Sequence, residues 1–82
     1  MSRKINHCFA SAIYHARVSR GIKQQEMADF LGRTKRWYQK IERGSSEPNL
    51  GDTILLMAFF HIDAVIILKE AGIHVSIFTH SK

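Results

Sequence analysis

Lysine, arginine and glutamine side chains gather between residues 34 and 43, and their types and spacing suit contact with nucleic acid. Lys35, Arg36, Gln39 and Lys40 fall on one side of a segment with helical spacing, and Arg43 follows at its end. In the major groove of DNA, arginine and lysine bond guanine O6 and N7, while glutamine bonds adenine N6 and N7. A good bidentate pair contributes ~1–3 kcal/mol of discrimination. The cluster therefore predicts a helix whose outward face reads bases.

Histidine and cysteine are the other side chains that could bind a ligand. The chain has five histidines and one cysteine, but none shows the Cys-x-x-Cys or His-x-x-x-His spacing of a zinc site, so we expect no metal. Cys8 is expected to be buried as a small apolar residue. Because no Ser/His/Asp set, paired carboxylates, phosphate loop or dinucleotide glycine pattern is present, we expect neither catalysis nor a cofactor.

Two short helices joined by a glycine turn must position the basic cluster. The first is predicted over residues 24–31, and Thr34 is a good N-cap for a second helix that runs to Arg43. Ala28 supplies a small side chain where the two helices touch, and Gly32 suits a turn that needs positive φ. Two short helices joined by a three-residue turn with glycine form the helix-turn-helix plan.

The rest of the chain completes a mainly helical domain with a short strand. The apolar spacing predicts helices over residues 6–19 and 50–61, and Asn49 can cap the second of them. Residues 64–72 fit a helix capped by Asp63 but also suit a strand, and we favour the helix. Residues 73–79 alternate apolar and polar side chains, which predicts a strand.

The second half of the chain predicts assembly. A helix that is apolar on nearly every side needs a cover, and a lone strand at a chain end needs a partner strand. Pairing with a second copy about a two-fold axis supplies both. We expect a homodimer through Val65, Ile66, Leu68, Ile73, Val75 and Ile77. The alternative is a tail that folds back onto its own domain.

The net charge of +5 is concentrated in the first half of the chain. Residues 1–43 hold ten lysines and arginines against three acidic residues, whereas residues 44–82 hold two against four. A polyanion is the expected partner of the first half and a protein that of the second. A solvated basic face without a partner is the alternative.

One cysteine rules out an intrachain disulfide, and the longest apolar run is far shorter than the ~20 residues of a membrane span, so we expect a cytoplasmic protein.

Apolar, glycine, glutamine and Glu-Arg-Gly positions fall in one register along the chain. They are Ile13, Ala16, Arg17, Gly21, Ile22, Gln24, Met27, Ala28, Leu31, Gly32, Ile41–Gly44 and Pro48–Leu50. This pattern closely resembles the lambda-repressor-like helix-turn-helix family, also called the Cro or XRE type, over about residues 9–63. The resemblance implies a five-helix DNA-binding domain that usually dimerises and regulates transcription. By position, it implies that Lys35, Arg36 and Lys40 read bases. Phosphate or orienting contacts are implied for Gln24, Gln39 and Arg43.

Four residues depart from the pattern of that family. Lys23 stands where serine or threonine usually caps a helix, and Arg33 replaces an apolar turn residue. Larger side chains, Trp37 and Tyr38, stand on the second helix. We expect Tyr38 in the core with its hydroxyl at the edge. Trp37 is expected either to pack against the domain or to contact the DNA backbone or a thymine methyl.

Glu42 is expected to pair with a nearby arginine such as Arg17, because an outward carboxylate would repel DNA.

The expected domain covers residues 1–72, with the helix-turn-helix at about 24–43 and a dimerising tail at 73–82. The expected DNA contacts are Gln24, Thr34, Lys35, Arg36, Trp37, Gln39, Lys40 and Arg43.

The sequence thus predicts a transcriptional regulator, most simply a repressor, that reads an inverted repeat of double-stranded DNA as a homodimer. The alternative is an antitoxin-like adaptor. Its apolar half would bind a toxin or another regulator, and its DNA binding would autoregulate the pair.

Overall fold

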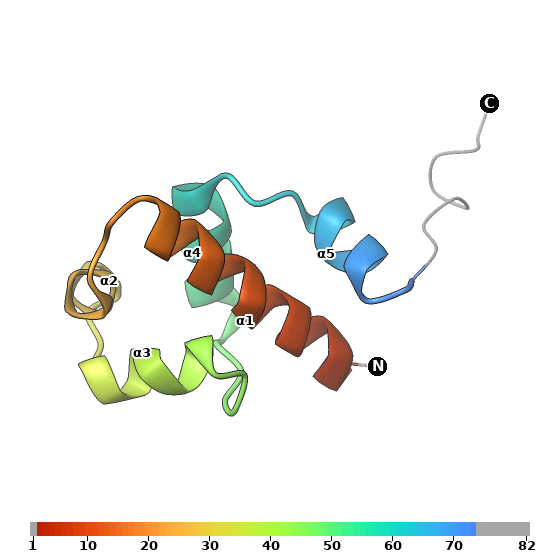
Figure 1. Ribbon diagram of the computed structural model, residues 1–82. Helices are drawn as coiled ribbons and strands as arrows, with labels where there is room; N and C mark the ends of the chain where they lie inside the picture. Colours follow the sequence, from red (N-terminus) through yellow and green to blue (C-terminus); the bar gives the residue numbers. More distant parts are fainter. Residues whose placement is uncertain (1, 74–82) are drawn as a thin grey trace.

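In a computed structural model that describes residues 2–73, the chain forms five helices (Figure 1). They are α1 (Ser2–Ser19), α2 (Gln24–Leu31), α3 (Lys35–Glu42), α4 (Leu50–Phe60) and α5 (Ala64–Glu70). The mainly helical fold predicted from the sequence is confirmed. The predicted strand begins at Ile73 and otherwise lies outside the described residues, as do Val75 and Ile77 of the predicted dimer interface.

The helix ends follow the predicted caps. The side chains of Thr34, Asn49 and Asp63 accept hydrogen bonds of 2.8–3.1 Å from the first turns of α3, α4 and α5. Lys23, which has no side-chain acceptor, makes no side-chain cap for α2. The Glu26 carboxylate instead accepts a bond of 2.8 Å from the Lys23 backbone N–H. An acid one turn later thus satisfies the backbone of the cap residue, as in half of a capping box.

The first helix is longer than predicted, because α1 begins at Ser2 and not at Asn6. The Asn6 amide donates long hydrogen bonds to the carbonyl oxygens of Gly44 (3.4 Å) and Ser46 (3.5 Å). These bonds join the early turns of α1 to the loop that follows α3. The pattern of apolar spacing could not reveal this extension, because the contacts that support it are polar and lie 38 and 40 residues away.

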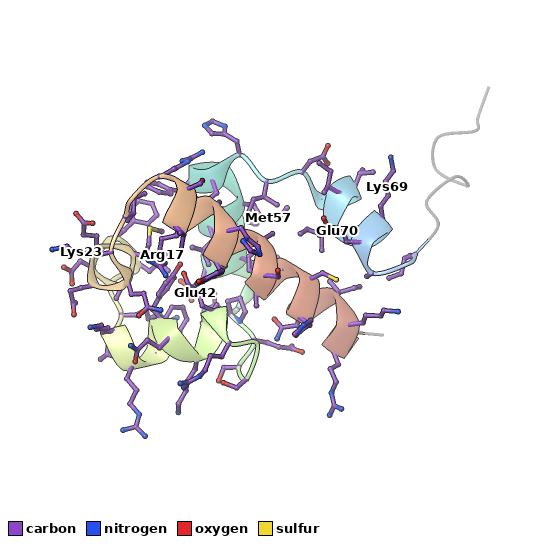
Figure 2. All side chains as sticks on the ribbon, in the orientation of Figure 1. Arg17, Lys23, Glu42, Met57, Lys69 and Glu70 are labelled. Atoms are coloured by element: carbon purple, nitrogen blue, oxygen red, sulfur yellow. The ribbon has the colours of Figure 1, made fainter. Side chains whose placement is uncertain are left out.

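The segment that suited either a helix or a strand is a helix, α5, as favoured from the sequence. Ile67 is buried and joins the core, while Asp63 caps the first turn. α5 packs against α1, and Lys69 in its last turn is exposed and projects away from the other helices (Figure 2).

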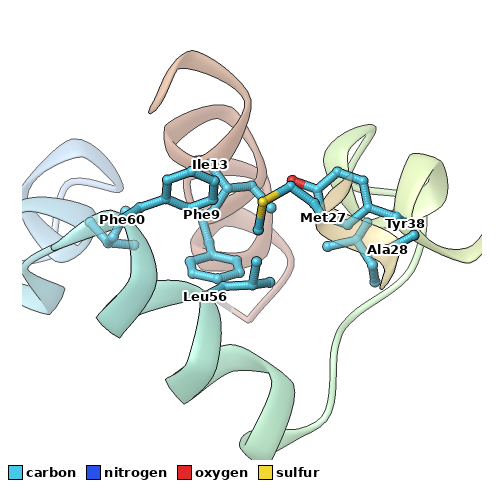
Figure 3. Packing of buried hydrophobic residues seen from close by; sticks show 9 residues of the cluster. Phe9, Ile13, Met27, Ala28, Tyr38, Leu56 and Phe60 are labelled. Atoms are coloured by element: carbon cyan, nitrogen blue, oxygen red, sulfur yellow. The ribbon is translucent and has the colours of Figure 1, made fainter. Parts of the chain in front are cut away.

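The core gathers around α1, which contacts α3, α4 and α5, while α2 packs on α3. Figure 3 shows side chains from separate helices meeting there. The buried cluster comprises Phe9, Ile13, Met27, Ala28, Tyr38, Ile41, Leu56, Phe60 and Ile67.

The described residues contain no single helix that is long and apolar enough to cross a membrane. α4 and α5 meet that criterion only as a pair, across a break at which they bend by 101°.

Tyr38 lies deeper than predicted. Its side chain is fully buried, and its hydroxyl has no hydrogen-bond partner among residues 2–73, so the expectation of a hydroxyl at the edge was wrong. Burial, reinforced by the nearby Glu42 carboxylate, raises the pKa of Tyr38. The phenol therefore acts as a neutral packing group in the centre of the domain.

Two adjacent leucines of α4 test this core. Leu56 is fully buried, whereas Leu55 is 46% exposed. We expect Leu56→Ala to lower the free energy of unfolding by about 2–5 kcal/mol, because it leaves a cavity. Leu55→Ala should change it by less than about 1 kcal/mol. Urea unfolding followed by circular dichroism measures both. Equal losses would contradict the placement of α4.

Candidate nucleic-acid interface

α3 turns one face into the core and the other outward. Tyr38 and Ile41 are buried, whereas Lys35, Arg36 and Lys40, the predicted base readers, are exposed. The helix begins at the Thr34 cap, whose hydroxyl oxygen accepts a bond of 3.1 Å from the Trp37 N–H. In Figure 2, long side chains project from α3 away from the other helices. The N-terminal end of α3 thus presents free cationic groups on a capped helix.

The acidic residue at the end of α3 turns inward. Glu42 forms a two-bond ion pair with Arg17 of α1, at 2.5 Å to Nε and 3.1 Å to Nη2. The predicted Arg17–Glu42 pair is confirmed. Arg17 also donates from Nη1 to the Ile22 carbonyl oxygen at 2.7 Å, and its bond to Glu42 raises its pKa. The pair locks α3 to α1 and removes a negative charge from the outer face.

Two glutamines extend the ion pair across the helix-turn-helix. The Gln24 amide donates to Glu42 Oε1 at 3.1 Å, and the Gln39 amide donates to Gln24 Oε1 at 3.1 Å. Both side chains are partly buried. The chain of bonds sets the orientation of Gln24 at the start of α2 and of Gln39 on α3, next to the exposed Arg43.

A second ion pair lies at the opposite end of α3 and had not been predicted. Arg33, in the turn, donates to Asp52 of α4 at 2.6 Å and lies 4.7 Å from the centre of the Trp37 ring. Trp37 is partly buried and packs against the core. The departure of Arg33 from the apolar turn pattern was visible in the sequence. Its partner was not, because Asp52 lies 19 residues away on another helix.

Arg20 is a further cation that the protein itself uses. It donates to the carbonyl oxygens of Phe59 (3.0 Å) and Phe60 (3.3 Å), and its guanidinium lies within 6 Å of both ring centres. These bonds satisfy free carbonyls at the end of α4. In the described part of the chain, the ion pairs use only Arg17 and Arg33, so the cations of α3 stay free.

The residues predicted for dimerisation are divided by the structure. On α5, Val65 and Ile66 are exposed, whereas Leu68 lines an apolar hollow with Phe9 and Met57. Ile73 is partly buried. α4 also exposes apolar side chains that were not predicted as an interface: Leu50, Ile54 and Leu55.

The other candidate ligands do not gather. Cys8 is partly buried and packs against the core. Within residues 2–73, no three histidine, cysteine, aspartate or glutamate side chains lie close enough together to hold a metal ion.

Comparison with known proteins gives a consistent match. A protein-family model described as helix-turn-helix matches residues 13–67. The chain is 38% identical over 61 residues to the SPbeta prophage-derived uncharacterized HTH-type transcriptional regulator YonR of Bacillus subtilis (strain 168). That match covers 74% of this chain and 56% of the relative, so the chain spans little more than half of the relative's length. No solved structure matches the chain.

Removal of one partner of the α1–α3 ion pair should be more harmful than removal of both. We expect Arg17→Met to lower the free energy of unfolding by about 3–5 kcal/mol, because it leaves Glu42 buried without its cation. The double variant Arg17→Met/Glu42→Leu should recover most of that loss. Lys69→Met, which removes an exposed cation of α5, should change it by less than about 0.5 kcal/mol. Urea unfolding measures all three, and equal losses in the single and double variants would contradict this role of the pair.

Proposed function

The chain belongs to the helix-turn-helix family of the Cro and XRE type, and from that premise we propose that it regulates transcription by reading an inverted repeat as a homodimer. The observation that carries the proposal is the charge on the outer face of α3. Lys35, Arg36 and Lys40 are exposed, while the acidic Glu42 of the same helix is turned inward and neutralised by Arg17. A helix with this face fits the major groove, whose base edges accept hydrogen bonds from these side chains.

The proposed contacts divide into base readers and backbone contacts. Lys35, Arg36 and Lys40 read base edges, while Arg43 lies at the end of α3, where a phosphate passes. Gln24, Thr34, Trp37 and Gln39 complete the interface by orienting the helix or touching the backbone. Because lysine and arginine displace counterions from phosphates, binding falls steeply as salt rises.

Exposed apolar surface in the second half of the chain supports the two-fold part of the proposal. In this arrangement residues 1–72 form the DNA-binding domain and residues 73–82 the dimerising tail. The exposed Val65 and Ile66 of α5 supply apolar surface that a second copy covers. Two copies place their α3 helices about 34 Å apart, one duplex turn. Each bound half-site then raises the effective concentration of the other, and occupancy of the operator represses transcription.

A second candidate function has an observation of its own. α4 exposes Leu50, Ile54 and Leu55, and the proposed dimer interface uses none of them. Exposed apolar groups on one helix suit a protein partner. This surface favours the antitoxin-like adaptor, in which a toxin or another regulator covers α4 while DNA binding autoregulates the pair.

Selection of bound duplexes from a random DNA pool by the purified protein tests the proposed function. At near-physiological salt, we expect enrichment of an inverted repeat whose half-site centres lie about ten base pairs apart. If no sequence is enriched and binding vanishes as salt rises, the basic face contacts only phosphates, and sequence-specific regulation is ruled out for the chain alone.

Two arginines separate base reading from phosphate contact. Arg36→Ala should relax the preference at one base position per half-site, by about 1–3 kcal/mol. Arg43→Ala should weaken binding to all sequences about equally and reduce the salt slope by about one. Repeating the selection with each variant measures the preference, and titrations at several salt concentrations measure the slope. If both variants lose affinity with unchanged preference, the assignment of the reading face is wrong.

Substitutions at two exposed isoleucines test which helix forms the dimer interface and which is free for another partner. Ile66 on α5 is 52% exposed, and Ile54 on α4 is 56% exposed. Ile66→Glu should convert the dimer to monomer in sedimentation experiments and weaken operator binding at least ~100-fold, because the second half-site no longer helps the first. Ile54→Glu should keep both properties. If Ile54→Glu dissociates the dimer and Ile66→Glu does not, the two copies meet through α4.

A further inference from the structure

Arg33 joins three elements at the N-terminal end of α3. It lies in the turn after α2, its Nη2 donates to Asp52 Oδ2 at 2.6 Å, and its guanidinium lies 4.7 Å from the Trp37 ring centre. Trp37 lies in the first turn of α3, and Asp52 lies in the first turn of α4. One side chain therefore links the turn, the proposed reading helix and α4.

Asp52 is the fixed end of this link. Its side chain is 9% exposed, against 38% for that of Arg33, and its backbone N–H is bonded to the Asn49 cap at 2.8 Å. A buried carboxylate is costly without a cation, so Arg33 is held strongly.

Trp37 is held from three sides. Its backbone N–H is bonded to the Thr34 side chain, its ring packs against the core, and Arg33 lies over the ring. Its neighbour Arg36 is exposed, as is Lys35. The contacts that fix Trp37 therefore fix the first turn of α3, which carries two of the three proposed base readers.

We propose that Arg33 is a positioning residue for base reading. With Asp52 and Trp37 it forms a cluster, the Arg33 cluster, that holds the first turn of α3 against α4. Lys35 and Arg36 then meet the base edges in one register. Asp52 binds the Arg33 charge, so that this arginine does not serve as a phosphate contact. The inference rests on the proposed function and adds to it a residue that acts through its neighbours.

Trp37 is the one tryptophan of the chain, so its fluorescence reports on the Arg33 cluster without DNA. Arg33→Met and Asp52→Asn should each raise the quenching constant with acrylamide about twofold, because the ring loses the guanidinium that covers one face. Lys69→Met removes an equal charge from α5 and should leave quenching unchanged. Unchanged quenching in the first two variants would show that Arg33 does not hold Trp37, and would overturn the proposal.

Duplex selection tests whether the Arg33 cluster acts on reading. The double variant Arg33→Met/Asp52→Asn is used because it leaves no unpaired buried carboxylate and so retains the fold. We expect about tenfold weaker preference at the base pairs nearest the N-terminal end of α3, with the salt slope unchanged. A uniform loss of affinity with a slope lower by about one would make Arg33 a phosphate contact and overturn the proposal.

Two further outcomes separate this inference from the function on which it rests. If quenching rises but the double variant keeps the wild-type preference, the Arg33 cluster is a packing contact only and the proposal fails. If the wild-type protein enriches no sequence, the proposed function fails and the positioning role fails with it, while the quenching result still shows whether Arg33 holds Trp37.

Discussion

The buried pair between Arg17 and Glu42 is the interaction on which the arrangement of the helix-turn-helix depends. It sets the rotation of α3 about its own axis, because Glu42 can reach Arg17 only when Tyr38 and Ile41 also face the core. Once that rotation is set, Lys35, Arg36 and Lys40 must face outward. The hydrogen bonds of Gln24 to Glu42 and of Gln39 to Gln24 tie α2 to α3 in the same orientation. The packing of α3 thus decides the sign of its exposed charge. Glu42, the one acidic residue of the helix, faces inward, and the lysines and arginine face solvent.

The basic residues of the first half of the chain therefore fall into two groups. Arg17, Arg20 and Arg33 are used inside the protein, to pair with acids or to satisfy helix carbonyls. Lys35, Arg36 and Lys40 of α3 are exposed and take part in neither ion pair of the described residues. Net charge alone does not separate these groups, since the internal arginines count equally in the sum. The geometry separates the two groups of cations. Arg17 and Arg33 lie within reach of carboxylates on other helices. Lys35 and Arg36 lie in the first turn of α3, which contains no acidic residue.

Local chemistry made much of this structure predictable from the sequence. The caps at Thr34, Asn49 and Asp63 act over two or three residues, so a short stretch of sequence is enough to predict them. The Arg17–Glu42 pair was predictable because a single acid on a helix expected to face DNA must find a cation. The Arg33–Asp52 pair and the bonds from Asn6 to the loop after α3 were not, because they join elements whose relative placement no local pattern specifies. The depth of the Tyr38 hydroxyl depends in the same way on packing from several helices.

The outer surfaces of α4 and α5 carry apolar side chains that the small core does not cover. A small domain buries a smaller share of its surface than a larger one does, and most of the large apolar side chains exposed here lie on these two helices, with others on α1 and α2. Val65 and Ile66 belong to α5, whereas Leu50, Ile54 and Leu55 belong to α4. α4 and α5 meet at a bend of 101°, so the two sets lie on helices that run in different directions. The dimer interface proposed on α5 and the partner surface proposed on α4 therefore share no residue, so one proposal does not exclude the other.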